Sequence, residues 1–197
     1  PASNAYPDVP GFYGEKALTG WKRVVDEVHA AGGTIIPQLW HTGSFRQLGM
    51  EPDPTIPGVG PSPVAHPFHE GKGEIPQEMT HSDISAVIDS YVRATVSAEQ
   101  LGFDGVELHG AHGYIIDQFF WDFTNKRTDQ YGGSLQNRLR FAIELVTAMR
   151  EAVAPDFPIV LRFSQWKLGS YETKMFDNPN DLEKFLIPLS DAGVDVF

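Results

Sequence analysis

Four segments of the chain repeat apolar residues at the spacing of about 3.6 that is typical of an amphipathic helix. These segments cover residues 18–28, 84–96, 135–149 and 182–189. Each has residues at its ends that commonly start or stop helices. The expected N-caps are Ser82 or Asp83 and Ser134, and the expected ends are Gly32-Gly33, Gly102 and Gly193. The pattern therefore predicts four helices, each with one apolar face.

Short apolar runs bounded by turn residues lie between these segments and predict strands. The runs are residues 34–40, 105–109, 158–163 and 194–197. Helices and strands thus alternate with short joints, which implies right-handed crossovers and a parallel sheet. Residues 51–77 are rich in proline and glycine and lack periodicity, so we expect a long loop or a small excursion after the first strand.

Two α/β architectures fit this order, a doubly wound sheet and a (β/α)8 TIM barrel. A doubly wound dinucleotide fold would place G-x-G-x-x-G after a strand, and the chain has no such motif. Polar residues instead share one parity near the carboxyl ends of the predicted strands, where barrel active sites lie. They are Gln38, Trp40, Glu107, His109, Arg162 and Ser164. We therefore expect a barrel, of which the predicted strands form about half, because a complete barrel takes ~250 residues.

Composition and charge narrow the class of partner. The chain is 41% hydrophobic and 21% charged, which is typical of a globular protein, and its net charge of −11 argues against nucleic acid or anionic membrane as partners. No apolar run approaches the ~18 residues of a membrane span, and no secretory leader opens the chain. The absence of cysteine excludes a disulfide or thiol nucleophile within these residues. We expect a cytoplasmic protein with a small-molecule substrate, and a homo-oligomer is compatible with the sequence.

The stretch "LHGAHGYIIDQFF" places His109, His112 and Tyr114 where a predicted strand ends. Both histidines could simply cap the strand and bond the loop backbone. A metal site could use the pair together with Glu107 and His41, but His-x-x-His outside a helix does not reliably place both rings on one face. In a third interpretation, two imidazole N–H groups meet one ligand oxygen and a tyrosine, with an ordinary pKa of ~10, donates a proton. This suits an electron-poor carbonyl or nitro substrate.

Three other polar positions also have two interpretations. Arg162 could pair with Glu107, or stabilise negative charge on a bound cofactor. The amide of Gln38 suits the edge of a heterocycle, and Trp40 is either a core residue or a pocket wall. A cation at Arg162 would repel a metal ion, so we expect no metal in this site.

Several motifs together resemble the Old Yellow Enzyme family of flavin-dependent ene-reductases. "HGAHGYIIDQFF" and "TNKRTDQYGGSLQNRLRF" carry the resemblance, with "PDVPGFY", "GWKRVVDEVHAAGGTIIPQLWHTG" and "LRFS" at the family's spacing on either side. The resemblance implies a (β/α)8 barrel that holds FMN at its C-terminal mouth. It also implies that NAD(P)H reduces the flavin, which passes hydride to an activated alkene that a tyrosine protonates.

The resemblance also assigns roles to individual residues. The histidine pair would bind the substrate's activating oxygen, and the tyrosine would donate the proton. An amide would contact the pyrimidine edge of the flavin, a guanidinium would lie beside its N1 and O2, and an indole would form a substrate wall. The implied catalytic residues are Tyr114, His109 and His112, the cofactor-binding residues Gln38 and Arg162, and the substrate-binding residues Trp40, His109 and His112.

Two segments depart from the family pattern. Trp121-Asp122-Phe123 replaces a segment that often contains Ser-Pro, and Gln165-Trp166-Lys167 follows "LRFS" where proline is common. Both should border the substrate site, so we expect a different substrate shape. We interpret "RTDQYGGS" as a structural turn that leads to Ser134. Residues 1–197 would be the central part of one barrel domain, strands three to six, with both flanks missing. A metal-dependent barrel hydrolase and a non-catalytic barrel fragment remain alternatives.

Overall fold

The main sheet is parallel and its strands follow the order of the chain. The computed structural model describes residues 3–69, 72–167 and 170–197. Strands β1 (Gln38–Leu39), β4 (Val106–Gly110) and β5 (Ile159–Phe163) lie side by side in that order, all parallel. The fourth predicted strand contributes one parallel bridge, between Val160 and Val196. The predicted parallel α/β arrangement is therefore confirmed for these segments.

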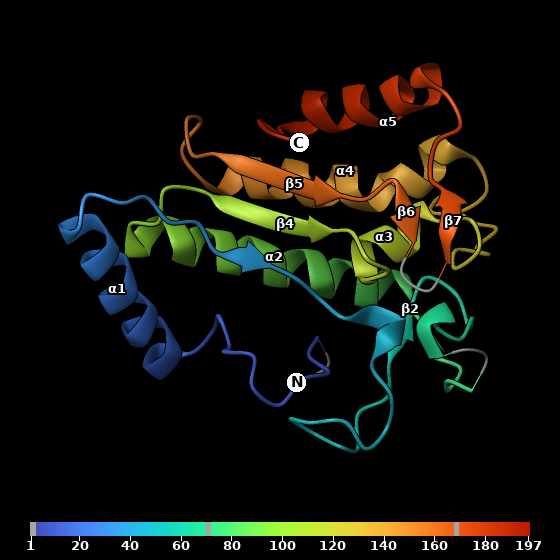
Figure 1. Cartoon of the computed structure of the whole chain (residues 1–197), viewed down its shortest axis with the longest axis horizontal. Coiled ribbons are helices and arrows are strands. Elements are labelled where there is room, and N and C mark those ends of the chain that lie inside the picture. The colour runs from blue at the N-terminus through green and yellow to red at the C-terminus, as the bar shows by residue number, and fades with distance from the viewer. Residues whose placement is uncertain (1–2, 70–71, 168–169) are drawn as a thin grey trace.

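All four predicted helices are present, and they cover one face of this sheet (Figure 1). The N-cap expected at Ser82 or Asp83 is wrong. The helix begins at His81 with Thr80 as its N-cap, because Thr80 and Asp83 form a reciprocal capping box. Ser134 and Gly102 act as expected, the latter in the left-handed conformation that favours glycine. The helices are α1 (Glu15–Ala30), α2 (His81–Leu101), α4 (Leu135–Ala152) and α5 (Pro179–Ala192).

The two faces of the sheet have opposite character. Leu39, Leu108 and Leu161 align in register and are fully buried against the helices. Positions of the other parity form the face without helices, where Gln38 pairs in register with Glu107, and His109 with Arg162. The predicted parity is thus correct. Gln38 and Arg162 are exposed, so this second face is open among the described residues.

The segment after β1 forms the small excursion that the sequence predicts. It contains the short pair β2 (Val59–Gly60) and β3 (Gln77–Glu78), with single 3-10 turns at Gly43–Phe45 (η1) and Pro67–His69 (η2). The excursion packs against the sheet's carboxyl end rather than linking two domains, because β2 contacts the residues that follow β4. In Figure 1 it lies at the end of the sheet toward which the strand arrows point.

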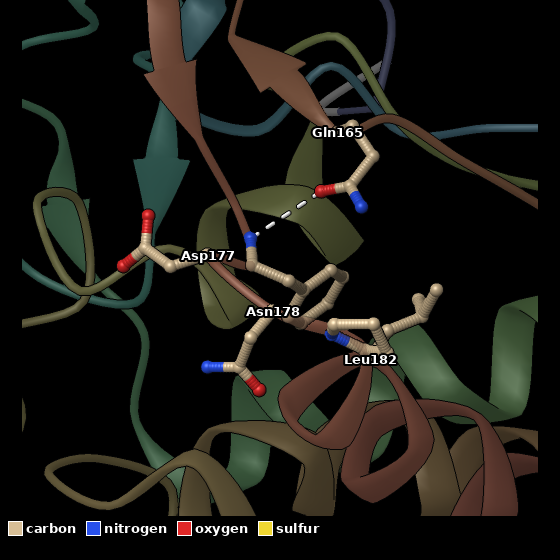
Figure 2. Close-up of a pocket in the computed structure, with 6 residues that line it drawn as sticks. Gln165, Asp177, Asn178 and Leu182 are labelled. Atoms are coloured by element: carbon tan, nitrogen blue, oxygen red, sulfur yellow. Dashed lines mark hydrogen bonds between the residues drawn. The ribbon is translucent and has the colours of Figure 1, made fainter.

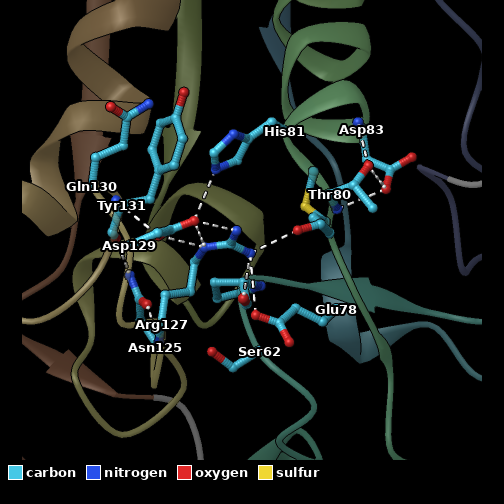
Figure 3. Close-up of polar contacts among 12 residues, drawn as sticks. Ser62, Glu78, Thr80, His81, Asp83, Asn125, Arg127, Asp129, Gln130 and Tyr131 are labelled. Carbon is cyan, nitrogen blue, oxygen red and sulfur yellow. Dashed lines mark hydrogen bonds and ion pairs between the residues drawn. The ribbon is translucent and has the colours of Figure 1, made fainter.

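The "RTDQYGGS" turn has the structural role that we expected. The Arg127 guanidinium forms a two-bond contact with Asp129 and donates to the carbonyls of Pro61 (2.9 Å) and Met79 (2.7 Å), as Figure 3 shows. It thereby fixes the excursion to the segment before α4. A Cβ at Gly132 would lie only 2.0 Å from the Arg127 carbonyl oxygen, so glycine is required there.

One helix and one hairpin that follow the strands of the main sheet were not predicted. Helix α3 (Ile115–Phe120) has six residues, all buried, and therefore shows no amphipathic period. Strands β6 (Trp166–Lys167) and β7 (Ser170–Lys174) form an antiparallel hairpin directly after β5. The helix and the hairpin both lie at the carboxyl end of the main sheet (Figure 1). Among the helices that the structure describes, none is both long and apolar enough to span a bilayer.

Candidate active site

The turn after β4 sets the geometry of the histidine pair. His109 lies near the end of β4, and His112 has φ of 61°, a left-handed conformation that costs energy for a residue other than glycine. The backbone N–H of His112 donates to the Ser164 hydroxyl (3.3 Å), and that of Gly113 donates to Asp117 Oδ2 (2.8 Å). These bonds hold the strained turn, which brings the two imidazole centroids to 5.2 Å.

Tyr114 and Trp40 join the same cluster. The Tyr114 ring lies 5.2 Å from the His109 ring and 4.8 Å from the Trp40 ring, which it meets edge-on. Trp40 follows β1 and also approaches His109, at 6.2 Å. The structure therefore brings together four of the residues that the sequence singled out, from the ends of two adjacent parallel strands.

The phenol of Tyr114 has a partner that the sequence did not reveal. Its hydroxyl oxygen lies 3.0 Å from that of Tyr6, in a hydrogen bond between residues 108 positions apart. Tyr6 is itself stacked on Phe45 at 5.4 Å. Burial, together with the bond to Tyr6, raises the pKa of Tyr114 well above its ordinary value. The phenol is therefore protonated at neutral pH and available as a proton donor.

Both histidines are neutral at physiological pH. Burial, with smaller contributions from His112 and Arg162, lowers the pKa of His109 to about 4. Burial and the Arg162 charge also lower the pKa of His112. Each ring thus carries one N–H and one lone pair. His109 Nδ1 is buried and has no hydrogen-bond partner among the described residues, so no described group fixes the tautomer of this ring.

Gln38 and Arg162 lie on the open face of the sheet, away from the helix-covered core. The Gln38 amide donates to Glu107 across β1 and β4. The alternative pairing of Arg162 with Glu107 is not observed among the described residues, where Glu107 is engaged by Gln38 and Arg162 aligns with His109. An exposed guanidinium and an amide therefore border the same edge as the histidine pair.

The residues considered for a metal site are not assembled as ligands. His41 is buried, and its Nδ1 accepts a hydrogen bond from the Gly43 N–H (3.0 Å), while Glu107 is engaged by Gln38. Within residues 3–69, 72–167 and 170–197, no group of three or more His, Asp or Glu side chains could hold a metal ion. The metal interpretation thus has no support in this geometry.

A buried ion pair behind the histidine turn was also missed. Asp117 of α3 pairs with Lys167 of β6, and both side chains are almost completely buried, at 0% and 1% exposure. Burial raises the pKa of Asp117, and the neighbouring ammonium opposes this effect. The only sequence signal was a carboxylate inside the apolar run "IIDQFF". Its partner lies 50 residues away, so no local pattern could identify it.

Two further contacts support the turn from the side of the excursion. The Gly113 carbonyl accepts hydrogen bonds from Gln118 Nε2 (2.6 Å) and from His66 Nε2 (2.8 Å). Gln118 also accepts from the Ser44 N–H (3.0 Å), which connects it to the loop after β1. The turn that holds His112 is therefore bonded to three separate segments.

A shallow pocket of about 260 Å³ lies beside the hairpin, at the start of α5 (Figure 2). Gln165 Oε1 accepts from the Phe176 N–H (3.3 Å) at its edge. None of the histidine, tyrosine or tryptophan residues of the cluster lines this pocket. We therefore assign the candidate site to the cluster at the carboxyl end of β4, not to this hollow.

Known proteins are similar to this chain in sequence and in structure. The chain is 40% identical over 191 residues to "12-oxophytodienoate reductase 2" of Arabidopsis thaliana, an overlap of 94% of this chain and 50% of the relative. It is 36% identical over 193 residues to "Probable inactive reductase easA" of Epichloe festucae var. lolii, covering 98% and 50%. A solved structure of morphinone reductase in complex with tetrahydroNAD superposes with a TM-score of 0.84 and 33% identity, covering 98% and 56%.

The fold of this chain is thus shared with a solved reductase structure. Residues 1–195 match the family model described as NADH:flavin oxidoreductase / NADH oxidase. The chain belongs to this family, which confirms the resemblance to Old Yellow Enzyme. It spans about half the length of these relatives.

Proposed function

We propose that the intact protein is an FMN-dependent NAD(P)H oxidoreductase that reduces activated alkenes, namely α,β-unsaturated carbonyl or nitro compounds. The observation that carries this proposal is the cluster of His109, His112 and Tyr114 at the carboxyl end of β4. The His109 ring centroid lies 5.2 Å from those of both His112 and Tyr114. Two neutral imidazoles and a protonated phenol in this arrangement suit a substrate that needs its oxygen polarised and one carbon protonated.

The roles of these residues follow from their chemistry. His109 and His112 would each donate an N–H to the substrate's carbonyl or nitro oxygen, where negative charge develops as the alkene is reduced. Tyr114 would give its proton to the carbon next to the activating group. Its bond to Tyr6 orients the hydroxyl, and Trp40 forms the wall on that side.

The residues on the open face fit a flavin. Arg162 would lie where the isoalloxazine ring gains negative charge, and Gln38 would offer its amide to the pyrimidine edge. When bound, FMN would accept hydride from NADH or NADPH and deliver it to the alkene. An exposed guanidinium and an unpaired, buried His109 Nδ1 next to the same edge are consistent with a polar planar group resting there.

We also propose that residues 1–197 form part of a single (β/α)8 barrel domain. The open face of the sheet would then be the barrel interior, and the carboxyl end of β4 would lie at its catalytic mouth. The relatives are about twice as long as this chain, which leaves room for further strands. A cytoplasmic location and a homo-oligomeric state remain predictions from composition alone.

Family membership does not by itself decide catalysis, because one relative is named a probable inactive reductase. Two histidines and a tyrosine converge at the carboxyl end of β4, as an enzyme that polarises and protonates its substrate would need. The cluster therefore supports an active enzyme. A metal-dependent hydrolase would need ligands that the described residues do not assemble.

Arg162→Ala in the intact protein tests the flavin site without relying on turnover. Loss of a fixed positive charge beside the ring should weaken FMN binding and make the bound flavin harder to reduce. Arg23→Ala, an exposed arginine on α1, is the matched control and should change neither property. FMN titration and a spectroelectrochemical potential give both values. Wild-type protein without flavin absorbance, or with no cyclohexenone-dependent NAD(P)H oxidation under anaerobic conditions, would refute the proposed function.

A further inference from the structure

An aromatic row begins at the histidine pair and runs onto the β6–β7 hairpin. The Trp166 indole stacks on the His112 imidazole, with centroids 5.0 Å apart and planes 26° from parallel. Tyr171 of β7 continues the row at 5.3 Å from Trp166. Trp166 is 37% exposed and Tyr171 69% exposed, so flat apolar surface is displayed beside a candidate catalytic side chain.

The neighbouring residue on the hairpin anchors this aromatic wall. Lys167 is completely buried, whereas its neighbour Trp166 is partly exposed and stacks on His112. The Lys167 ammonium pairs with Asp117 and also lies 5.5 Å from the Trp121 ring. The pair is buried on both sides, so it holds the hairpin in one position relative to α3.

The same carboxylate also holds the histidine turn. One oxygen of Asp117 binds Lys167, and the other accepts the Gly113 N–H at 2.8 Å. A single buried group thus connects the turn that carries His112 to the hairpin that carries Trp166. Any shift of the hairpin would break a buried ion pair, which is costly because an unpaired charge would remain in the interior.

We propose that Trp166 is a specificity-determining residue, which recognises a flat, conjugated substituent on the alkene, and that Lys167 is its positioning residue. This inference rests on the proposed function. A substrate whose oxygen is held by His112 lies within reach of the indole face. An aryl group on the alkene gains stacking contact there, whereas a methyl group at the same carbon does not.

Two aldehydes that differ only in this substituent test the proposal. Cinnamaldehyde and crotonaldehyde share the unsaturated aldehyde and carry phenyl and methyl groups, respectively. In the FMN-loaded intact protein, Trp166→Ala should raise the Kd and KM for cinnamaldehyde roughly three- to tenfold, from the loss of one stacking contact. The values for crotonaldehyde and the kcat for both should change less than about twofold. Trp166→Phe should restore most of the preference.

Tyr13→Ala is the matched control for an exposed aromatic side chain. Tyr13 is 66% exposed and precedes α1, so its removal should leave the ratio of the two aldehyde affinities unchanged. Parallel changes for both aldehydes in Trp166→Ala, or no change for either, would overturn the role of Trp166.

The positioning role of Lys167 has a separate readout. Lys167→Met should reduce the preference for cinnamaldehyde in wild-type protein, but should reduce it no further when Trp166→Ala is already present. Additive losses would overturn the role of Lys167. Lys167→Gln keeps a donor for Asp117 and replaces Lys167→Met if that variant does not fold.

Binding and turnover separate this inference from the proposed function. Dissociation constants are measured on the oxidised protein without NAD(P)H, and turnover is measured with it. A preference that depends on Trp166 without any alkene reduction would support the aromatic wall and refute the reductase. If both aldehydes were reduced and the ratio of their dissociation constants were unchanged in Trp166→Ala, the reductase would be supported and the aromatic wall refuted. Failure of the wild-type protein to bind either aldehyde would refute both.

Discussion

At the scale of single residues, the chemistry of the candidate site depends on which protons are present at neutral pH. Tyr114 is protonated, since a phenol has an ordinary pKa of ~10 and burial with the contact to Tyr6 raises it further. His109 and His112 are neutral because burial lowers theirs. The cluster therefore contains one acid that is protonated and two rings that can donate without carrying charge. This division separates proton transfer from oxygen binding.

Replacing Tyr114 by Phe should affect only one of the two half-reactions. In the proposed function, the phenol protonates the alkene carbon in a step that occurs after the nicotinamide has left. In the intact protein, the rate of flavin reduction by NAD(P)H should therefore stay nearly unchanged. The rate of reoxidation by a weakly activated enone should fall ~10²–10⁴-fold, the usual loss for a general acid. Stopped-flow absorbance of each half-reaction gives the two rates.

The double variant His109→Ala, His112→Ala provides the contrast. It removes the proposed oxygen-binding groups, so it should weaken the binding of phenolic ligands and slow the reduction of all enones. Nitroalkenes should still react in Tyr114→Phe, because they accept hydride without immediate protonation. If Tyr114→Phe slowed both half-reactions equally, or left enone reduction untouched, Tyr114 would not be the proton donor.

Some site residues are recognisable in the sequence and others are not. His109, His112 and Tyr114 lie within six consecutive positions at a strand end, so a local motif is enough to find them. Tyr6 joins the cluster from 108 positions away. Lys167 becomes informative only when its ammonium is seen inside the fold beside Asp117. Contacts between distant residues leave no periodic trace, which is why the sequence did not predict them.

At the scale of elements, the loop after β1 and the turn after β4 form one hydrogen-bonded unit. His66 is 1% exposed, donates through Nε2 to Gly113 and accepts the Phe68 N–H at Nδ1 (3.2 Å). His41 similarly accepts the Gly43 N–H. Both rings use a lone pair that protonation would remove. The loops are therefore assembled correctly only while these two histidines are neutral.

This arrangement predicts a loss of stability in acid. Burial lowers the folded-state pKa of both His41 and His66 to about 4, against an ordinary value of 6.5. The unfolded chain then binds protons first, so stability is fully present above about pH 6.5 and falls as the pH drops toward 4. Between pH 7 and 5 each histidine should remove about 2 kcal/mol from the free energy of unfolding. Urea titrations of the intact protein at each pH measure this loss.

Substitutions of His66 and His41 test whether these two histidines cause the loss of stability at low pH. His66→Asn should lower stability at pH 7 but flatten its dependence on pH, and adding His41→Asn should flatten it further. His81→Asn is the control, because His81 lies at the surface, where its side chain is 63% exposed. An unchanged pH dependence in the double variant would exclude His41 and His66 as the cause.

Long elements with a clear apolar period could be predicted from the sequence, whereas short elements could not. The four long helices have clear apolar faces, and several of their ends carry a local signal, such as Ser134 before α4 and Gly193 after α5. The start of α2 was misplaced because Ser82 and Asp83 are good N-caps in isolation, and only the reciprocal bonds select Thr80. Helix α3 and the β6–β7 hairpin are too short for a period, and tertiary contacts define them.

At the scale of the whole molecule, the chain covers one face of its sheet with helices and leaves the other open (Figure 1). The alternation of buried leucines with Gln38, His109 and Arg162 follows from strand geometry, so the sequence was sufficient to predict this division. What the sequence could not specify is how the open face is covered. The open face bears the proposed flavin contacts. We therefore expect the affinity for FMN to depend on which further segments of the intact protein pack over this face.

Residues 1–197 in isolation should therefore hold FMN weakly and self-associate. Strand β1 and the segment around Val196 are the two edges of the sheet, and unpaired edges template association. Light scattering after size exclusion, with FMN titration, measures both properties, and the intact protein is the reference. Val196→Lys should reduce association, because a charge on an exposed edge opposes strand pairing. Val24→Lys, on the exposed surface of α1, should not. A monodisperse 197-residue chain with tight, stoichiometric FMN would show that the open face needs no cover.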